Sequence, residues 1–336
     1  MVHRSLATTA LSVLDLAKIS SGQTVGETFA HSKELAQHVE RLGYTRYWFA
    51  EHHNIQGIAS AATSILIGYI AENTKTLRVG SGGIMLPNHS PLIIAEQFGT
   101  LESLYPNRID LGLGRAPGSD RLTMQAIRGT NSQEIDFGDL VDELLYFFAP
   151  PEEGQKIRAV PGADVQVPIY ILGSSLYSAR LAARLGRPYA FAGHFAPAVM
   201  LQAFDVYKSN FKPSKILDKP YVMAGIPIIA AESDEKAAFL ATSVQQAFLG
   251  LVRGNRKFSA PPVENMDSLW NEPEKAAVES MLGLMITGAP KKIRNHLDSF
   301  IEMSGADELI ITSDTFAHAD RLKSYEYIAQ AKNSLF

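Results

Sequence analysis

Short apolar segments alternate with longer amphipathic segments along the whole chain, and this alternation limits the possible folds more than any other feature. Each of eight predicted strands is followed by a predicted helix, and the strands are expected at residues 11–16, 44–49, 76–80, 108–113, 167–172, 189–192, 221–230 and 308–312. Strict alternation of this kind predicts parallel strands joined by right-handed crossovers. Eight units favour an α/β fold of the closed (β/α)₈ barrel type, a TIM barrel, over an open doubly wound sheet.

One connection is longer than a crossover requires. Residues 231–290 follow the seventh strand and contain a predicted helix, an irregular stretch with three prolines and a further helix. A chain of 336 residues has a length typical of about two domains, but barrels can exceed that length as one domain. We therefore expect a single domain over residues 1–336, with an insertion at 251–289 after strand seven.

Composition excludes several classes of function. The 31 basic and 35 acidic residues are scattered, so no basic cluster predicts a nucleic-acid or membrane partner. The chain has no cysteine, which excludes disulfides, a thiolate nucleophile and cysteine-ligated metal centres. The first ten residues lack the apolar stretch of a secretory signal. We expect a cytoplasmic protein that binds neither nucleic acid nor membrane.

In such a barrel the ligand site lies at the carboxyl ends of the strands, so these ends hold the candidate residues. The fourth strand ends in glycine and is followed by Arg115, whose planar fork of donors suits phosphate or carboxylate. A surface arginine in a turn is an equally good interpretation of this segment alone. The glycines at 112, 114 and 118 do not have the spacing of a dinucleotide-binding fold.

The fifth strand ends at Gly173 and runs directly into a helix through Ser174 and Ser175. A serine here can simply cap the helix. The same free N–H groups also form an anion site. With Arg115 on the neighbouring strand, a phosphate held jointly by both ends becomes the favoured interpretation.

The second strand ends in Glu51, His52 and His53. Histidine titrates near neutral pH and is suited to moving protons. Adjacent residues on an extended segment point in opposite directions, so the two histidines are poorly placed to share a metal ion. We expect one functional histidine, His52, and one structural partner. No metal site is predicted.

The third and sixth strand ends add further candidates. Gly82 and Gly83 permit either the close approach of a flat ligand or an ordinary strand bulge. His194 and Phe195 follow the sixth strand, where the histidine either faces the pocket or helps to cap the next helix. His89 has the setting of a loop histidine.

Four ordered blocks resemble the bacterial luciferase-like flavin monooxygenase family, in its single-chain branch. They are WFAEHH at 48–53, GSGGIMLP at 80–87, RIDLGLGRAPG at 108–118 and LGSSLYSA at 172–179. The similarity extends over nearly the whole chain. It implies reduced FMN as cofactor, supplied by a separate NAD(P)H-dependent flavin reductase, and a homodimer. It also implies a flavin hydroperoxide, formed with O₂, that oxidises an aldehyde or another small organic substrate.

The resemblance also implies roles for individual residues. Arg115 matches the arginine that holds the flavin phosphate, and Gly173, Ser174 and Ser175 fall in the loop that contacts it. Gly82-Gly83 matches a non-proline cis peptide beneath the flavin ring, and His52 matches a catalytic histidine. His53, Met85, His194 and Phe195 are expected to line the substrate pocket, whose apolar members keep water out.

Two departures limit what the resemblance carries over. Gly114 stands where luciferases have a reactive cysteine, and Gly173 replaces an acidic residue. Three other functions remain open. One is a deazaflavin (F420)-dependent oxidoreductase, and another is a flavin-binding protein without turnover. The third is a metal-dependent hydrolase using Glu51, His52 and His53.

Overall fold

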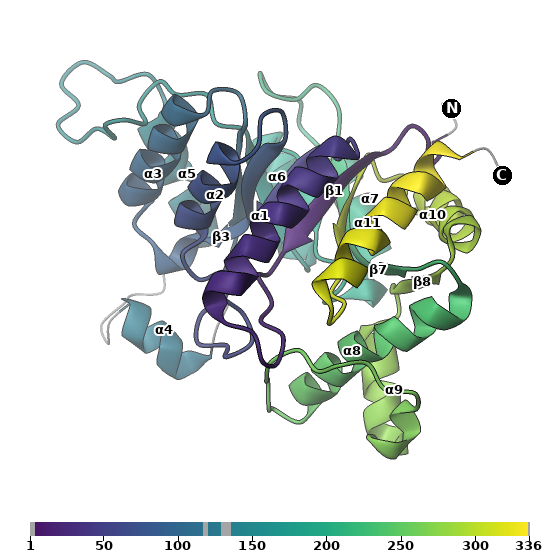
Figure 1. Cartoon of the computed structure of the whole chain (residues 1–336). Helices are drawn as coiled ribbons and strands as arrows, with labels where there is room; N and C mark the ends of the chain where they lie inside the picture. The colour runs from purple at the N-terminus through teal and green to yellow at the C-terminus, as the bar shows by residue number, and fades with distance from the viewer. Residues whose placement is uncertain (1–3, 117–119, 129–135, 335–336) are drawn as a thin grey trace.

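Eight parallel strands close into a barrel that carries its helices on the outside (Figure 1). The structure is a computed structural model that describes residues 4–116, 120–128 and 136–334. The barrel strands are β1 (Ala10–Asp15), β2 (Arg46–Phe49), β3 (Arg78–Met85), β4 (Ile109–Gly114), β5 (Ile169–Gly173), β6 (Tyr189–Phe191), β7 (Val222–Ala230) and β9 (Glu308–Thr312). β9 pairs with both β7 and β1, and this closes the sheet. The predicted (β/α)₈ barrel is confirmed.

The helices lie close to the positions that the amphipathic segments predict. They are α1 (Val25–Arg41), α2 (Thr63–Glu72), α3 (Pro91–Leu104), α4 (Arg121–Arg128), α5 (Phe137–Phe148), α6 (Leu176–Leu185), α7 (Met200–Asn210), α8 (Asp234–Val252), α9 (Glu272–Met281), α10 (Pro290–Ser304) and α11 (His318–Asn333). The sequence predicts a capping box for α1. Thr24 and Glu27 form it, each bonding the other's backbone N–H. None of the helices in the described ranges is long and apolar enough to cross a bilayer.

Apolar side chains pack on both sides of the barrel wall. The larger core lies between the strands and the surrounding helices, and Tyr47, Ile67 and Phe98 are buried in it. A smaller cluster inside the barrel includes Trp48 and Tyr170. The alternation of side chains along each strand produces these two layers.

The amino end of the barrel is closed by charges rather than by apolar side chains. Arg46 bonds to Asp110 at 2.8 Å and to Glu308 at 3.0 Å, while Arg78 bonds to Asp110 at 2.6 Å. Both carboxylates are fully buried. Buried charges are tolerated only when they are paired and hydrogen-bonded, so this network serves stability at the end opposite the ligand site.

A bulge disturbs β3 beside β4. Ser81 pairs with Leu111, but the next pair joins Ile84 to Leu113, so β3 holds an extra residue there. The Ser81 hydroxyl occupies the gap, donating to the Gly112 carbonyl at 2.8 Å and accepting from its N–H at 3.0 Å. A side chain at Gly112 would collide with the Ser81 carbonyl. The neighbouring strand therefore explains this glycine.

The connection after β7 holds an element that the sequence does not reveal. Residues 251–289, the expected insertion, contain the end of α8, a 3₁₀ turn (Met266–Ser268), α9 and the short strand β8 (Ile286–Gly288). β8 pairs with the end of β7, outside the barrel ring. Figure 1 shows α8 and α9 at the lower right, beside the carboxyl ends of the strands.

Loops from three distant parts of the chain are joined over this end of the barrel. Ile19 N–H donates to the Gly57 carbonyl at 3.0 Å. Ser21 N–H donates to the Ser259 carbonyl at 2.9 Å, and Ser259 N–H donates back to Ile19 at 2.9 Å. We call these joined loops, residues 17–21, 57–59 and 259, the loop bridge. Four of its residues, Lys18, Gly57, Ile58 and Ser259, line a cavity at this end of the barrel.

Candidate active site

A cavity of about 850 Å³ opens at the carboxyl ends of the strands. This volume lies within the range of sites for small molecules and cofactors. Its apolar lining comes from the loops after β1 and β2, from β7 and from α8, and includes Leu16, Ile58, Pro227, Ile229, Val244, Ala247, Phe248 and Leu251. Its polar members include His52, His53 and His194. The cavity thus combines a hydrophobic chamber with three proton-carrying side chains.

Glu51 organises the loop after β2. This carboxylate is fully buried, yet His53 Nε2 lies 2.8 Å and His89 Nε2 2.9 Å from its Oε1. The backbone N–H of Met85 donates to Oε2 at 2.9 Å. Burial alone would raise the pKa of Glu51, but these partners, His89 foremost, hold it below its usual value.

His52 and His194 lie near each other on the cavity wall. Burial lowers the pKa of His194 to about 4, and nearby His52 and Lys18 lower it too, against the opposing effect of Asp314. The imidazole of His194 is therefore neutral at physiological pH. Its Nδ1 lies against the backbone of Gly225, and its ring lies 4.3 Å from that of Phe195. The half-exposed Phe195 also lines the cavity.

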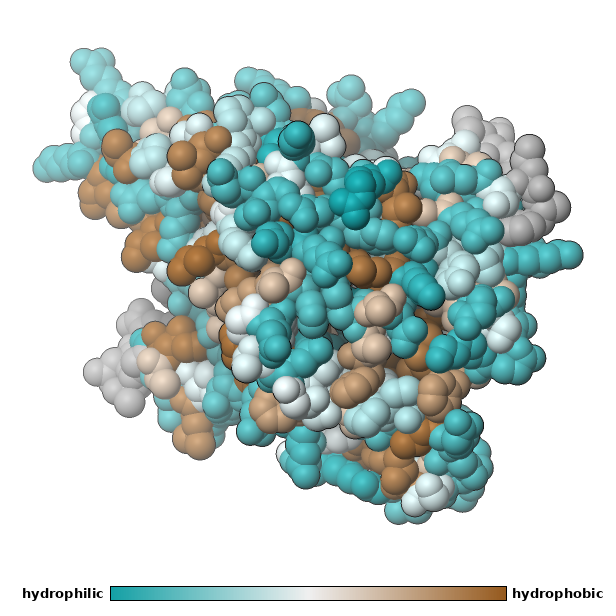
Figure 2. All heavy atoms as spheres, viewed as in Figure 1, coloured by the Kyte–Doolittle hydropathy of each residue, from teal (hydrophilic) through white to brown (hydrophobic). Residues whose placement is uncertain are grey.

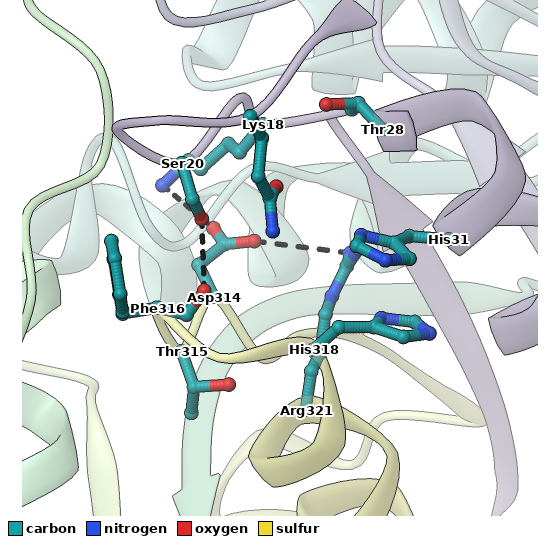
Figure 3. A pocket seen from close by; sticks show the side chains of 10 residues that line it. Lys18, Ser20, Thr28, His31, Asp314, Thr315, Phe316, His318 and Arg321 are labelled. Atoms are coloured by element: carbon teal, nitrogen blue, oxygen red, sulfur yellow. Dashed lines mark hydrogen bonds and ion pairs between the residues drawn. The ribbon is translucent and has the colours of Figure 1, made fainter. Parts of the chain in front are cut away.

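Lys18 and Asp314 form an ion pair at 2.8 Å in the cavity wall. Figure 3 shows the pair from the other side, where it borders a pocket of only about 20 Å³. Nη2 of Arg321 lies 3.9 Å from Oδ1 of Asp314. The same nitrogen makes a closer ion pair with Asp15, at 2.8 Å. The pair separates the large cavity from this small polar pocket.

The predicted phosphate-binding residues lie together beside the cavity. The Arg115 guanidinium stacks on the ring of Tyr177, which lies in the first turn of α6. The carbon of the guanidinium is 4.6 Å from the centre of that ring. Ser175 is the N-cap of α6, but its side chain makes no capping bond. Capping, the simpler interpretation of this serine, is therefore not what the structure shows. Gly173 ends β5, and Ser174 is exposed in the turn that follows.

These side chains suit an anionic group. An exposed arginine and a helix N-terminus whose cap residue keeps its hydroxyl free provide both charge and donors. Ala116, which follows Arg115, lines the cavity itself. The candidate phosphate-binding residues therefore adjoin the cavity.

Other predicted residues lie outside the cavity lining. Gly82 and Gly83 lie in the β3 bulge, and the peptide bond between them is cis, as the resemblance implies. Met85 supplies its N–H to Glu51, while its sulfur packs against Gly114. His52, His53, His194 and Phe195 are brought together in the lining, whereas the two glycines and Met85 are not part of it, so the expectation that Met85 lines the pocket is wrong.

Several residues of the site have no signal in the sequence. His89 has the appearance of an ordinary loop histidine, but it binds the same carboxylate as His53. Lys18 and Asp314 are 296 positions apart, and only closure of the barrel brings them together. The sequence predicts the helix that becomes α8, but not that its residues line the cavity. Within the described ranges, no group of three histidines, cysteines or carboxylates is placed to hold a metal ion.

Comparison with known proteins identifies the family. The model of the luciferase-like monooxygenases matches residues 9–308. A luciferase-like monooxygenase of Escherichia coli (strain K12) is 53% identical over 98% of both chains. The crystal structure of apo-MsnO8 is 32% identical and superimposes with a TM-score of 0.86, covering 97% of this chain and 98% of that one. The oxygenating constituent of 3,6-diketocamphane monooxygenase from Pseudomonas putida, solved with FMN, shares the fold with a TM-score of 0.71 at 16% identity, over 98% and 99% of the chains. The chain belongs to the luciferase-like monooxygenase family.

Proposed function

We propose that this protein is a flavin-dependent monooxygenase that binds reduced FMN and uses O₂ to oxidise an aldehyde or another small organic molecule. One observation carries the proposal. An apolar chamber with three histidines adjoins an exposed arginine and a helix N-terminus suited to phosphate. Family membership supports the oxygenase chemistry.

The residues present suit FMN. Arg115, Ser174 and Ser175, with the N-terminus of α6, would hold the phosphate, and Gly173 would leave the backbone there accessible. Gly82 and Gly83 would lie against the ring system. When bound, reduced flavin supplies the electrons with which O₂ is activated, and the protein contributes orientation and shielding.

The chain's own residues would then protect the reaction and move its protons. The apolar wall, including Val244 and Phe248 from α8, would keep water away from the reacting groups. His52 would act as the acid or base during oxygen transfer. His53, His194 and Phe195 would contact the substrate, and Met85 would support the wall beside them.

Two partners belong to this proposal. A separate NAD(P)H-dependent flavin reductase would deliver reduced FMN, as the resemblance implies. A second copy of the chain would form a homodimer.

The decisive experiment is anaerobic titration with reduced FMN, followed by mixing with ¹⁸O₂ and a panel of aldehydes and other small organic substrates. Incorporation of one labelled oxygen atom into a product supports the proposal. Tight binding without product over the whole panel would instead favour a flavin-binding protein without turnover. Binding of reduced deazaflavin in preference to reduced FMN would favour an F420-dependent oxidoreductase.

The role of His52 can be tested in the same assay. His52→Ala is expected to lower product formation by roughly 10²- to 10⁴-fold, the usual contribution of a general acid or base. Affinity for reduced FMN is expected to change little, and a parallel titration checks this. A His52→Ala enzyme that forms product as fast as the wild type would eliminate the catalytic role.

A further inference from the structure

We propose that Glu51 is a positioning residue that fixes the ring of His53, so that Nδ1 of His53 holds and releases a proton inside the cavity. The inference rests on the proposed function, because that proton would serve the same oxygenation. It assigns a second proton-carrying group beside His52. The contacts that support it join residues of this chain and involve no cofactor.

The hydrogen-bond donors around Glu51 determine the state of both imidazoles. An ionised carboxylate only accepts hydrogen bonds. The Met85 N–H donates to its Oε2, and the Asn88 side-chain amide donates to its Oε1 at 3.4 Å. His53 Nε2, at 2.8 Å, and His89 Nε2, at 2.9 Å, must therefore carry hydrogens. In the neutral ring this leaves Nδ1 as the acceptor. A carboxylate that fixes the tautomer of a histidine is a recurring device in proton transfer.

The two histidines differ in what their second nitrogen can reach. His53 lines the cavity, whereas His89 follows the 3₁₀ turn Leu86–Asn88 and is not part of the lining. His53 Nδ1 is therefore the nitrogen available to a bound molecule. His89 shares the carboxylate but not the cavity, and so provides a matched control within the same chain.

Several charged or titratable groups share the cavity or the carboxylate with His53. They are Glu51 and His52 from the same loop, Lys18 after β1, His89 after β3, Asp120 before α4, His194 after β6, Asp314 after β9, and Arg256 and Lys257 from the insertion. Glu51 alone among them is fully buried and bonded directly to His53. It is the group that sets the orientation of the ring.

Glu51→Gln gives a specific expectation, because an amide has one accepting and one donating side. The N–H of Met85 cannot change, so the amide oxygen must face it. The NH₂ group then replaces Oε1, against His53. His53 can relieve the contact between two donors only by moving its hydrogen to Nδ1. His89 also approaches Oε2, at 3.0 Å, and keeps an acceptor there.

The first test is ¹⁵N NMR of histidine-labelled protein without cofactor, which reports the tautomer of each ring. His53→Gln and His89→Gln assign the two signals. We expect Nε2–H for both rings in the wild type, and a shift of His53 alone to Nδ1–H in Glu51→Gln. A wild-type His53 with its hydrogen on Nδ1, or one unaffected by Glu51→Gln, would overturn the proposal.

The second test is the pH profile of turnover in the ¹⁸O₂ assay. His53→Gln and Glu51→Gln are expected to lose roughly 10²- to 10⁴-fold in kcat with an altered pH profile, and the double variant should lose no more. His89→Gln, which removes a partner of Glu51 outside the cavity lining, should lose less kcat and shift the profile less than either of these variants. Equal losses in all three single variants, with an unchanged profile, would show a purely structural role. If the wild type forms no product, the proposed function fails, while the NMR experiment still decides the role of Glu51.

Discussion

At the scale of single residues, Arg115 provides the most direct test of the proposed phosphate site. Its guanidinium stacks on Tyr177, whose hydroxyl donates to Asp136 at 3.1 Å, so the ring beneath the arginine is itself held in place. Such stacking keeps the planar donor fork in one orientation, which a lysine cannot reproduce.

Arg115→Ala is expected to weaken binding of reduced FMN by about 1.5–3 kcal/mol, the usual effect of losing a hydrogen bond to a charged group. This corresponds to roughly a 10- to 150-fold higher Kd in an anaerobic titration. Arg115→Lys should show a smaller loss, and Arg158→Ala, at an exposed position outside the cavity lining, none. Unchanged affinity in Arg115→Ala would place the phosphate elsewhere.

The sequence could predict single site residues only as far as local chemistry reaches. It identifies His52 and His53 at a strand end, but the rule that neighbouring side chains diverge suggests that one of them is structural. In the structure both line the cavity, and His53 also bonds to Glu51. His89, the second histidine that bonds to Glu51, is 38 residues away from it in the chain. No local sequence pattern can predict a contact over that separation.

At the scale of elements, Asp15 joins strands and helices at the end of β1. Its carboxylate is fully buried. It accepts from Ser32 of α1 and Tyr47 of β2 and pairs with Arg321 of α11 at 2.8 Å. Burial alone would raise the pKa of Asp15, but Arg321 and the hydroxyl donors outweigh it and hold the pKa below its usual value.

Asp15→Asn is therefore expected to lower the free energy of unfolding by about 3–5 kcal/mol at pH 7, because it leaves Arg321 buried without its partner. The lowered pKa means that the folded state binds this proton less readily than the unfolded chain does. The stabilisation is thus complete above the unfolded pKa of about 3.9 and disappears as the pH falls through the lower folded value. Urea unfolding of both proteins between pH 7 and pH 3 should show the difference shrinking, and a constant difference would contradict this account.

The boundaries of elements were predictable where apolar periodicity is long. Helices α1, α3 and α11 and all eight barrel strands lie near their expected positions. β3 is longer than predicted, because Gly80, Gly82 and Gly83 interrupt the apolar alternation that marks a strand. β8 has only three residues and depends on pairing with β7, so no local pattern could reveal it.

At the scale of the whole molecule, one surface is unusually apolar. Figure 2 shows apolar side chains gathered on the left, over the part of the barrel where α2, α3 and α5 lie. Ile65 of α2 is 71% exposed and Leu104 of α3 is 63% exposed, and Ile93 of α3 is also exposed. A soluble surface seldom leaves such side chains together unless another protein covers them.

We expect this surface to join two copies of the chain. Wild-type protein should sediment as a dimer, and Ile65→Asp should shift it toward monomer by placing a charge in the interface. Ile216→Asp, at an exposed isoleucine in the turn before β7, is the control. A wild-type monomer, or a dimer that Ile65→Asp leaves intact, would rule out this surface.

The closure of the barrel by its first and last strands also has a genetic consequence. β1 finds its second neighbour only in β9, which begins at Glu308, so every shorter translation product leaves β1 and β7 with a free edge. Such edges pair readily with other chains. A stop codon that precedes Glu308 would therefore yield an aggregating product instead of a slightly weakened enzyme.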